Sequence, residues 1–367
     1  MRNRSLKLPA ALGYRMPAEW EPHASTWLAW PHFKDDWPGK FEPIPWVYAE
    51  IIRNLARHER VDLIVNSDRA EKNARAVLEL ADALSENVCF HRWRTDRVWT
   101  RDSGCIFLDP RLAPTERAKK DASLIALHFQ FNAWAKYDNY EFDAKLGARM
   151  AKAAGARVVH PMAGDDRVVL EGGSIDVNGR GTLLTTEECL LSTVQQRNPS
   201  MDRAAYEQMF ADYFGIQSVI WLDSGITGDD THGHVDDITR FVAPNRVVTM
   251  VEPNEQSENY APLYANLGRL KAARTTDGQK LEIVEIPLPR PVIFEGRQLP
   301  ASYANFYIAN GAVLVPVFND PNDRVALNTL AEVFPTREIV PIYSGDLIWG
   351  FGALHCMTQQ QPLVAGQ

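Results

Sequence analysis

Two histidines and four aspartates crowd into the nine residues from 229 to 237, Asp-Asp-Thr-His-Gly-His-Val-Asp-Asp, directly before an apolar run. If this segment is extended, His232, His234 and Asp236 project from one face, because alternate residues of a strand do so. Such a set fits two chemistries. One is zinc binding through imidazoles and a carboxylate, and the other is metal-free acid–base catalysis beside a carboxylate that binds a cation. A solvated turn explains any one of these residues, but not all six together.

Two further carboxylates stand directly before predicted strands. Asp102 lies in Trp99-Thr-Arg-Asp-Ser-Gly, and Glu171 is followed by two glycines. Taken alone, Asp102 predicts only a surface ion pair with Arg101, and Glu171 only a turn in which glycine allows a tight backbone path. Their role therefore depends on what the fold brings beside them.

The chain has four cysteines and no C-x-x-C, so neither a disulfide framework nor a zinc knuckle is predicted. Cys89, Cys105 and Cys189 lie in ordinary apolar surroundings, where a cysteine is usually an inert core side chain. Cys356 differs, because it lies within the polar and glycine-rich segment 350–361. Histidines and carboxylates elsewhere in the chain are available to activate it, so Cys356 is the candidate nucleophile.

In this order and at these spacings, the four segments resemble the agmatine deiminase and bacterial peptidylarginine deiminase family of guanidine-modifying enzymes. The resemblance covers nearly the whole chain. It rests on Met16-Pro-Ala-Glu-Trp-Glu-Pro-His23, Thr26-Trp-Leu-Ala-Trp-Pro31, Trp99-Thr-Arg-Asp102-Ser-Gly104, Phe131-Asn-Ala-Trp134, Glu171-Gly-Gly173, Arg197-Asn-Pro199, Asp230-Thr-His-Gly-His-Val-Asp236, Ser302-Tyr-Ala-Asn305 and His355-Cys-Met-Thr-Gln-Gln360.

The resemblance implies an α/β fold: the five-bladed α/β propeller of the pentein type, built from five ββαβ modules around a pseudo-fivefold axis. One catalytic domain then spans residues 1–367, because a division at the midpoint separates Asp102 and Glu171 from His234, Asp236 and Cys356.

The resemblance also implies a role for each site residue. Cys356 attacks the guanidinium carbon, and His234 protonates the departing ammonia and then activates water. Asp102 and Asp236 hold the guanidinium nitrogens, and Glu171 positions or polarises His234. Further substrate contacts are expected at Trp99, Asp230 and Asn305.

Those residue types suit the chemistry. A guanidinium is a poor electrophile because its charge is delocalised, so ionised carboxylates must fix it beside a thiolate, which the cation in turn favours. No metal and no organic cofactor is expected. The partner is a small cationic guanidino compound, and the products are ammonia and a urea derivative.

Three departures from the family pattern leave the substrate open. The family's Gly-Gly-Gly-Asn-Ile-His is here Gly350-Phe-Gly-Ala-Leu-His355, residues Ala135-Lys-Tyr-Asp-Asn139 replace two glycines after Trp134, and His232 replaces an asparagine. Agmatine, yielding N-carbamoylputrescine, is the first expectation. The alternatives are (peptidyl-)arginine or another guanidino compound, an amidinotransferase-like reaction, a metallohydrolase using His232, His234 and Asp236, and a non-catalytic guanidine-binding protein.

Length and composition exclude other classes. A chain of 367 residues, 45% hydrophobic and 23% charged, is ordinary globular protein with one large domain or two. The net charge of −8 argues against a nucleic-acid partner. The basic start at Met1–Pro9 lacks the apolar core of a secretory signal, and no apolar run is long enough to span a membrane. A cytoplasmic location is therefore expected, and a homo-oligomer stays open.

The elements that must position these residues alternate between strands and helices. Asn178-Gly179 and Asn310-Gly311 predict two-residue type I′ hairpins, and Pro244-Asn245 predicts a third turn. Predicted strands cover residues 61–65, 105–108, 123–131, 219–222, 239–242, 247–251 and 281–286. Predicted helices cover residues 46–57, 69–84, 142–154, 201–214 and 325–333.

Overall fold

Five sheets share one strand pattern in the structure, a computed structural model that describes residues 8–110 and 123–364. In each, the first strand pairs antiparallel with the second, and the second pairs parallel with the third. One sheet is built from both ends of the chain and adds a fourth strand. In spatial order they are β20 (Gln359–Pro362), β1 (His23–Ala29), β2 (Arg60–Val65), β3 (Val88–Arg92); β4 (Ile106–Leu108), β5 (Ile125–Leu127), β6 (Arg157–Val159); β9 (Asp176–Val177), β10 (Thr182–Thr186), β11 (Ser218–Leu222); β12 (Thr239–Ala243), β13 (Arg246–Val251), β14 (Glu282–Pro287); β17 (Tyr307–Ile308), β18 (Ala312–Val317), β19 (Glu338–Tyr343).

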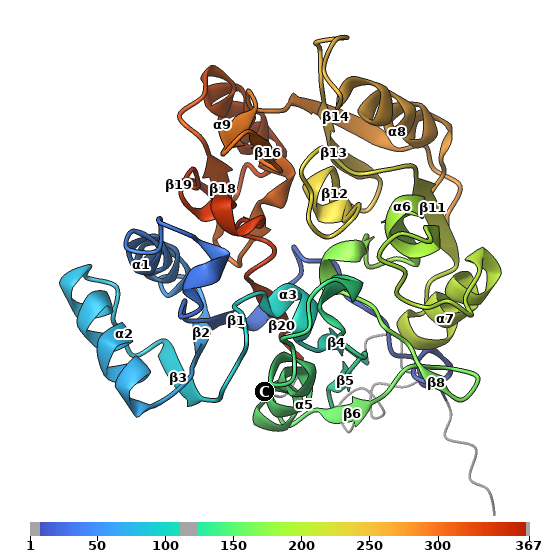
Figure 1. Cartoon of the computed structure of the whole chain (residues 1–367). Helices are drawn as coiled ribbons and strands as arrows, with labels where there is room; N and C mark the ends of the chain where they lie inside the picture. Colours follow the sequence, from blue (N-terminus) through green and yellow to red (C-terminus); the bar gives the residue numbers. More distant parts are fainter. Residues whose placement is uncertain (1–7, 111–122, 365–367) are drawn as a thin grey trace, which may run out of the picture.

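Helices connect the parallel strands, because parallel pairing requires a crossover. Most of them lie towards the rim of the molecule (Figure 1). Their sequences supply the caps: Ser67 accepts from the backbone N–H of Ala70 before α2, and Asp320 and Asp323 form a capping box at α9. The crossover helices are α1 (Ile44–Leu55), α2 (Asp68–Leu80), α5 (Leu146–Ala153), α6 (Glu187–Leu191), α7 (Arg203–Phe214), α8 (Tyr260–Ala272) and α9 (Pro321–Val333).

A short helical turn stands directly before the first strand of four sheets. These turns are α3 (Thr100–Ser103), η5 (Gly172–Ser174), η6 (Val235–Asp237) and η7 (Tyr303–Asn305). Successive turns contact one another near the centre of the molecule. In the remaining sheet, Cys356 holds the equivalent place just before β20. The repeated pattern therefore delivers one segment from each sheet to a common centre.

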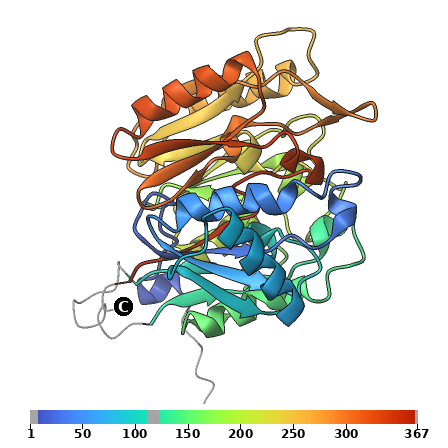
Figure 2. The same ribbon diagram turned by 90° about the vertical axis from the view of Figure 1, so that its left-hand side faces the viewer.

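The core joins neighbouring sheets. Trp27 of β1, Ile51 of α1 and Leu314 of β18 are buried in one hydrophobic cluster, although they lie far apart in the sequence. In the side view of Figure 2 the blue helices α1 and α2 lie in front of the strands of their sheet. Two small hairpins, β7 (Met162–Ala163) with β8 (Asp166–Arg167) and β15 (Val292–Phe294) with β16 (Arg297–Leu299), complete the strands of the described ranges.

The predicted α/β class is confirmed, and each predicted helix is found with shifted ends. The predicted strand over residues 123–131 shrinks to β5, and α8 is a helix that the apolar pattern did not predict. Residues 1–7 of the basic start lie outside the described residues. Within the described ranges, the structure contains no helix long and apolar enough to cross a membrane.

Both Asn-Gly hairpins form, but the predicted type I′ turns are wrong. Asn178 N–H bonds to the Thr182 carbonyl, which leaves a three-residue loop instead of two residues. At the other hairpin the loop has two residues, but neither Asn310 nor Gly311 has a positive φ. The Asn310 side chain instead bonds to the backbone N–H and C=O of His23, so a tertiary contact decides the turn.

Candidate active site

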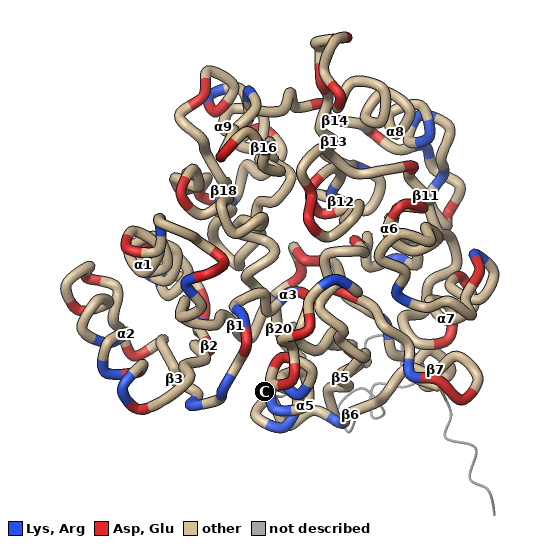
Figure 3. The backbone as a smooth tube through the Cα atoms, in the orientation of Figure 1, with Lys and Arg blue, Asp and Glu red and all other residues tan. Residues whose placement is uncertain are grey.

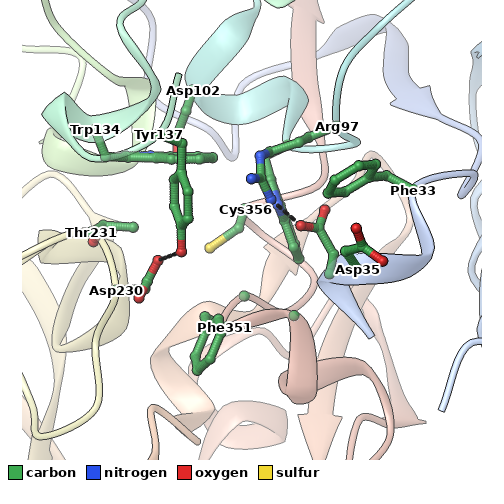
Figure 4. A pocket seen from close by; sticks show the side chains of 14 residues that line it. Phe33, Asp35, Arg97, Asp102, Trp134, Tyr137, Asp230, Thr231, Phe351 and Cys356 are labelled. Carbon is green, nitrogen blue, oxygen red and sulfur yellow. Dashed lines mark hydrogen bonds and ion pairs between the residues drawn. The ribbon is translucent and has the colours of Figure 1, made fainter. Parts of the chain in front are cut away.

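A cavity of about 230 Å³ opens over Asp102 of α3 and over Cys356, two of the segments that the sheets deliver. Cys356 lies at its floor with only 5% of its surface exposed, and Asp35 and Phe351 lie on other sides of it (Figure 4). Acidic segments gather beside α3 and β12 near the same centre (Figure 3). We call this cavity the central pocket; it is lined by Phe33, Asp35, Asp36, Arg97, Trp99, Asp102, Trp134, Tyr137, Asp230, Thr231, Gly350, Phe351, Gly352 and Cys356.

His234 lies behind the pocket floor, fully buried among three carboxylates. Its Nδ1 is 3.9 Å from Asp102 Oδ2 and 3.9 Å from Asp236 Oδ1, and its Nε2 is 3.9 Å from Glu171 Oε2. Burial alone lowers the pKa of a histidine, but the Asp102 carboxylate and its neighbours raise the pKa of His234 well above the ordinary value. The ring is therefore protonated in the free site, and neither ring nitrogen has a hydrogen-bond partner among the described residues.

Glu171 is held in its charged form by an arginine. Arg197 Nε donates to Glu171 Oε1 over 3.0 Å, and both side chains are fully buried. Burial raises the pKa of Glu171, but Arg197 and then His234 outweigh it and bring the pKa to about 2. The second oxygen, Oε2, lies 3.9 Å from His234 Nε2 and has no hydrogen-bond partner among the described residues.

Asp102 is anchored through both of its oxygens. Trp134 Nε1 donates to Oδ2 over 2.9 Å, and Gly173 N–H donates to Oδ1 over 3.0 Å. The chain presents Trp134 through a left-handed turn, with φ of 51°, 59° and 53° at Ala133, Trp134 and Ala135. Such angles cost about 1–2 kcal/mol per residue without a Gly, so this strain is consistent with a functional site. Burial raises the pKa of Asp102 to about 6.

Asp236 is anchored through one oxygen only. His355 Nδ1 lies 2.6 Å from Oδ2, while Oδ1 is buried with no hydrogen-bond partner among the described residues. Burial raises the pKa of Asp236, but the bond from His355 outweighs it and the pKa falls below its ordinary value. Asp236 therefore stays ionised, with Oδ1 3.9 Å from His234 Nδ1 and Oδ2 beside the Cys356 sulfur.

The Cys356 sulfur is 3.7 Å from Asp236 Oδ2 and accepts a hydrogen bond from Asn305 Nδ2 over 3.1 Å. Asn305 Oδ1 accepts from the backbone N–H groups of His355 and Cys356, so this amide fixes the segment that carries the thiol. Burial, followed by Asp236, raises the pKa of Cys356 well above its ordinary value. The free site therefore holds a thiol, and a cation bound between the carboxylates favours the thiolate.

Of the predicted substrate residues, Trp99, Asp102 and Asp230 line the central pocket, whereas Asp236 and Asn305 lie outside its lining. Trp99 packs beside the floor, next to Gly352. Asp230 is reached by Lys136 Nζ over 2.6 Å, by the Tyr137 hydroxyl over 2.6 Å and by Arg297 Nη2 over 3.1 Å. Burial raises the pKa of Asp230, but these donors lower it, so the carboxylate is ionised and already neutralised by its own neighbours.

The predicted face of His232, His234 and Asp236 does not form. Residues 229–237 contain no strand, and η6 begins at Val235, so alternate residues do not share a face. His232 has φ of 65°, and its Nε2 lies 3.1 Å from Ser192 Oγ, away from His234. The residue set of the metallohydrolase alternative is therefore not brought together.

Sequence patterns missed three contributors to this site. Cys189 was expected only in the core, and it is buried there, but its sulfur also lies within 4.8 Å of the ligand atoms of Glu171 and His234. Glu19 and Arg197 hold charged site residues from distant segments. The motifs Met16-Pro-Ala-Glu19 and Arg197-Asn-Pro199 were the only signals for them.

Gly173 is the residue around which the charged groups fit. A Cβ at this position would lie 2.6 Å from His234 Nδ1 and 3.0 Å from both Asp102 Oδ1 and Asp236 Oδ2. We expect Gly173→Ala to reduce kcat/KM by at least about 100-fold, because a shift of about 1 Å in a reacting geometry costs that much. Steady-state kinetics checks it, with Gly268→Ala in α8, where a Cβ meets nothing within 4 Å, as matched control. Equal activity of both variants contradicts the prediction.

Known proteins share this architecture. A family model described as Porphyromonas-type peptidyl-arginine deiminase matches residues 15–362. An agmatine deiminase of Pseudomonas aeruginosa is 35% identical over 373 residues, covering 96% of this chain and 97% of the relative. The solved agmatine deiminase of Enterococcus faecalis superposes with a TM-score of 0.87 at 28% identity over 99% of both chains. A cysteine-to-serine variant of C. jejuni agmatine deiminase, solved with substrate bound, gives 0.82 at 29% identity over 96% of this chain and 97% of that one.

Proposed function

The chain belongs to the Porphyromonas-type peptidyl-arginine deiminase family and is a hydrolase of a guanidino C–N bond; from this premise we propose that it hydrolyses agmatine to N-carbamoylputrescine and ammonia. The observation that carries the proposal is a thiol, Cys356, at the floor of a pocket that Asp102 also lines, with Asp236 Oδ2 3.7 Å from the sulfur and His234 between the two carboxylates. A planar cation placed against those carboxylates brings its carbon to the sulfur.

The reaction proceeds through a covalent intermediate. The bound guanidinium favours loss of the Cys356 proton to solvent, and the resulting thiolate attacks the guanidinium carbon. The tetrahedral adduct collapses as the C–N bond breaks and His234 gives a proton to the departing ammonia. A thiouronium remains on the sulfur. His234, now neutral, takes a proton from water that attacks the same carbon, and the C–S bond breaks to release the urea product and the thiol.

The charges of the pocket suit a substrate with a second positive charge. Asp36 pairs with Arg97, and Asp230 is neutralised by Lys136 and Arg297. Asp35, exposed at the pocket mouth, makes no hydrogen bond or ion pair with any other residue of the described ranges. Agmatine carries a guanidinium at one end and an ammonium at the other, so Asp35 is a partner for the second cation.

The test of this function is the release of ammonia from a set of guanidino compounds that differ in the group opposite the guanidinium. We expect turnover of agmatine, a KM about fivefold higher for pentylguanidine, which lacks the ammonium, and poorer turnover of arginine, which adds a carboxylate. Asp35→Asn should raise KM for agmatine and leave pentylguanidine unchanged. Lys72→Asn, an exposed site in α2 remote from the pocket, is the control. Absence of ammonia from every guanidine contradicts the function, and faster turnover of arginine or arginine peptides contradicts the substrate.

We propose that the whole chain, residues 1–367, is one catalytic domain with the architecture of a five-bladed α/β propeller. Five sheets of one strand pattern, each sending a segment to the same centre, support the arrangement. The hydrophobic cluster that joins β1, α1 and β18 supports a single domain. A cytoplasmic location and a homo-oligomeric assembly remain proposals from the sequence.

A further inference from the structure

His355 is clamped between two carboxylates. Its Nδ1 lies 2.6 Å from Asp236 Oδ2 and its Nε2 lies 2.8 Å from Glu19 Oε2, with 2% of the residue exposed. An ionised carboxylate accepts hydrogen bonds and has no hydrogen to donate. Both ring nitrogens must then carry hydrogen, which only the charged imidazolium does. No step of the reaction described above uses this ring.

Glu19 is fixed in its charged form by two buried arginines. Arg240 Nη2 lies 2.9 Å and Arg101 Nη2 3.3 Å from its Oε2, and Ile308 N–H donates to its Oε1 over 2.9 Å. Burial raises the pKa of Glu19, but Arg240, then His355 and Arg101, bring it well below the ordinary value. Nε2 of His355 is therefore bonded to a buried ion-pair network in which Glu19 contacts Arg101 of α3 and Arg240 of β12.

The inner end of the ring acts on the substrate side. His355 Nδ1 holds Asp236 Oδ2, the oxygen that lies 3.7 Å from the Cys356 sulfur, while Oδ1 of the same carboxylate lies 3.9 Å from His234 Nδ1. The next residue along the chain is Cys356, and Arg101 Nε donates to the His355 carbonyl over 3.3 Å. The same short segment thus places the thiol and the carboxylate that must face one substrate.

We propose that His355 is a positioning residue: as a doubly hydrogen-bonded imidazolium anchored on Glu19, it holds Asp236 with Oδ2 3.7 Å from the Cys356 sulfur, so that this carboxylate receives the guanidinium beside Cys356. This inference rests on the proposed function, because the guanidinium is the ligand that it orients.

The charged groups facing the ring are Asp236 from η6, Glu19 from the N-terminal segment, and, behind Glu19, Arg101 from α3 and Arg240 from β12. Removing the imidazolium removes a positive charge from Asp236, so the pKa of that carboxyl rises. A protonated Asp236 cannot hold a cation. The acid limb of kcat/KM should therefore move to higher pH, whereas a loss of folded protein lowers the whole profile without moving its limb.

The two half-replacements of the ring separate the proposal from a packing role. The amide of His355→Asn lies where Nδ1 was and can still donate to Asp236, whereas the amide of His355→Gln lies where Nε2 was and can donate only to Glu19. We expect kcat/KM to fall about 10-fold in H355N and about 100-fold in H355Q, mainly through KM, with the larger shift of the acid limb in H355Q. Equal losses in both variants, or an unmoved limb in H355Q, overturn the proposal.

The control is His128→Gln, a buried histidine whose Nε2 lies 3.1 Å from the carbonyl of Ala144 and which is not among the residues that line the pocket; its profile should keep the wild-type limb. If the His355 variants do not fold, nitrogen NMR of histidine-labelled wild-type protein still determines whether both ring nitrogens of His355 carry hydrogen. We expect His355 to show hydrogen on both ring nitrogens at neutral pH, and a neutral tautomer overturns the proposal. This measurement needs no turnover, so its failure is distinct from a wild-type enzyme that releases no ammonia from agmatine.

Discussion

Cys356→Ser is expected to lower the rate of ammonia release from agmatine by at least about 10,000-fold, because the hydroxyl cannot replace the thiolate that forms the covalent intermediate. The substitution is nearly isosteric, and the hydrogen bond from Asn305 can pass to the new oxygen, so folding and substrate affinity should persist. Stopped assays for ammonia with calorimetric binding of agmatine separate the two effects.

The matched control is Cys89→Ser in β3, a partly exposed cysteine outside the pocket, which should retain wild-type turnover. The raised pKa of Cys356 adds a chemical readout. Since a bound cation favours the thiolate, chloroacetamidine should alkylate Cys356 faster than neutral iodoacetamide does. More than about 1% residual turnover in Cys356→Ser, or preferred labelling of another cysteine, contradicts the nucleophile assignment.

The second large effect is expected at His234. His234→Gln should lower turnover by about 1000-fold, because both the departure of ammonia and the attack of water lose their proton carrier. Alkylation by chloroacetamidine needs no protonation of its leaving chloride, so this reaction should persist in the same variant. Kinetics with mass spectrometry of Cys356 measures both, and loss of the two reactions together contradicts a role limited to proton transfer.

His232→Gln is the matched control for His234, since the two histidines are separated by one residue and only His234 lies among the carboxylates. We expect the His232 variant to keep nearly full activity. The same variant also tests the metallohydrolase alternative, which requires both histidines. A loss at His232 equal to the loss at His234 contradicts the arrangement described for this site.

The sequence predicted those parts of the fold that depend on neighbouring residues along the chain. Apolar periodicity located most strands and helices, because burial of one face repeats with the period of the element. It missed α8, which has a weakly amphipathic sequence, and it misjudged the turn at Asn310, whose side chain bonds to His23 from a segment 287 residues away. Local patterns carry no information about such partners.

The sequence by itself determined the chemistry of this protein. Its residue types and their order were enough to identify a thiol, a histidine and carboxylates that suit a guanidinium substrate. The tertiary structure alone decided which atoms act together. It separated His234 from His232, because the positive φ of His232 turns that ring towards Ser192, and it placed His355 on Oδ2 of Asp236. It also brought Glu19 to His355 across 336 residues. The direction of a side chain depends on backbone turns and on contacts between distant segments. Neither can be predicted from a local stretch of sequence.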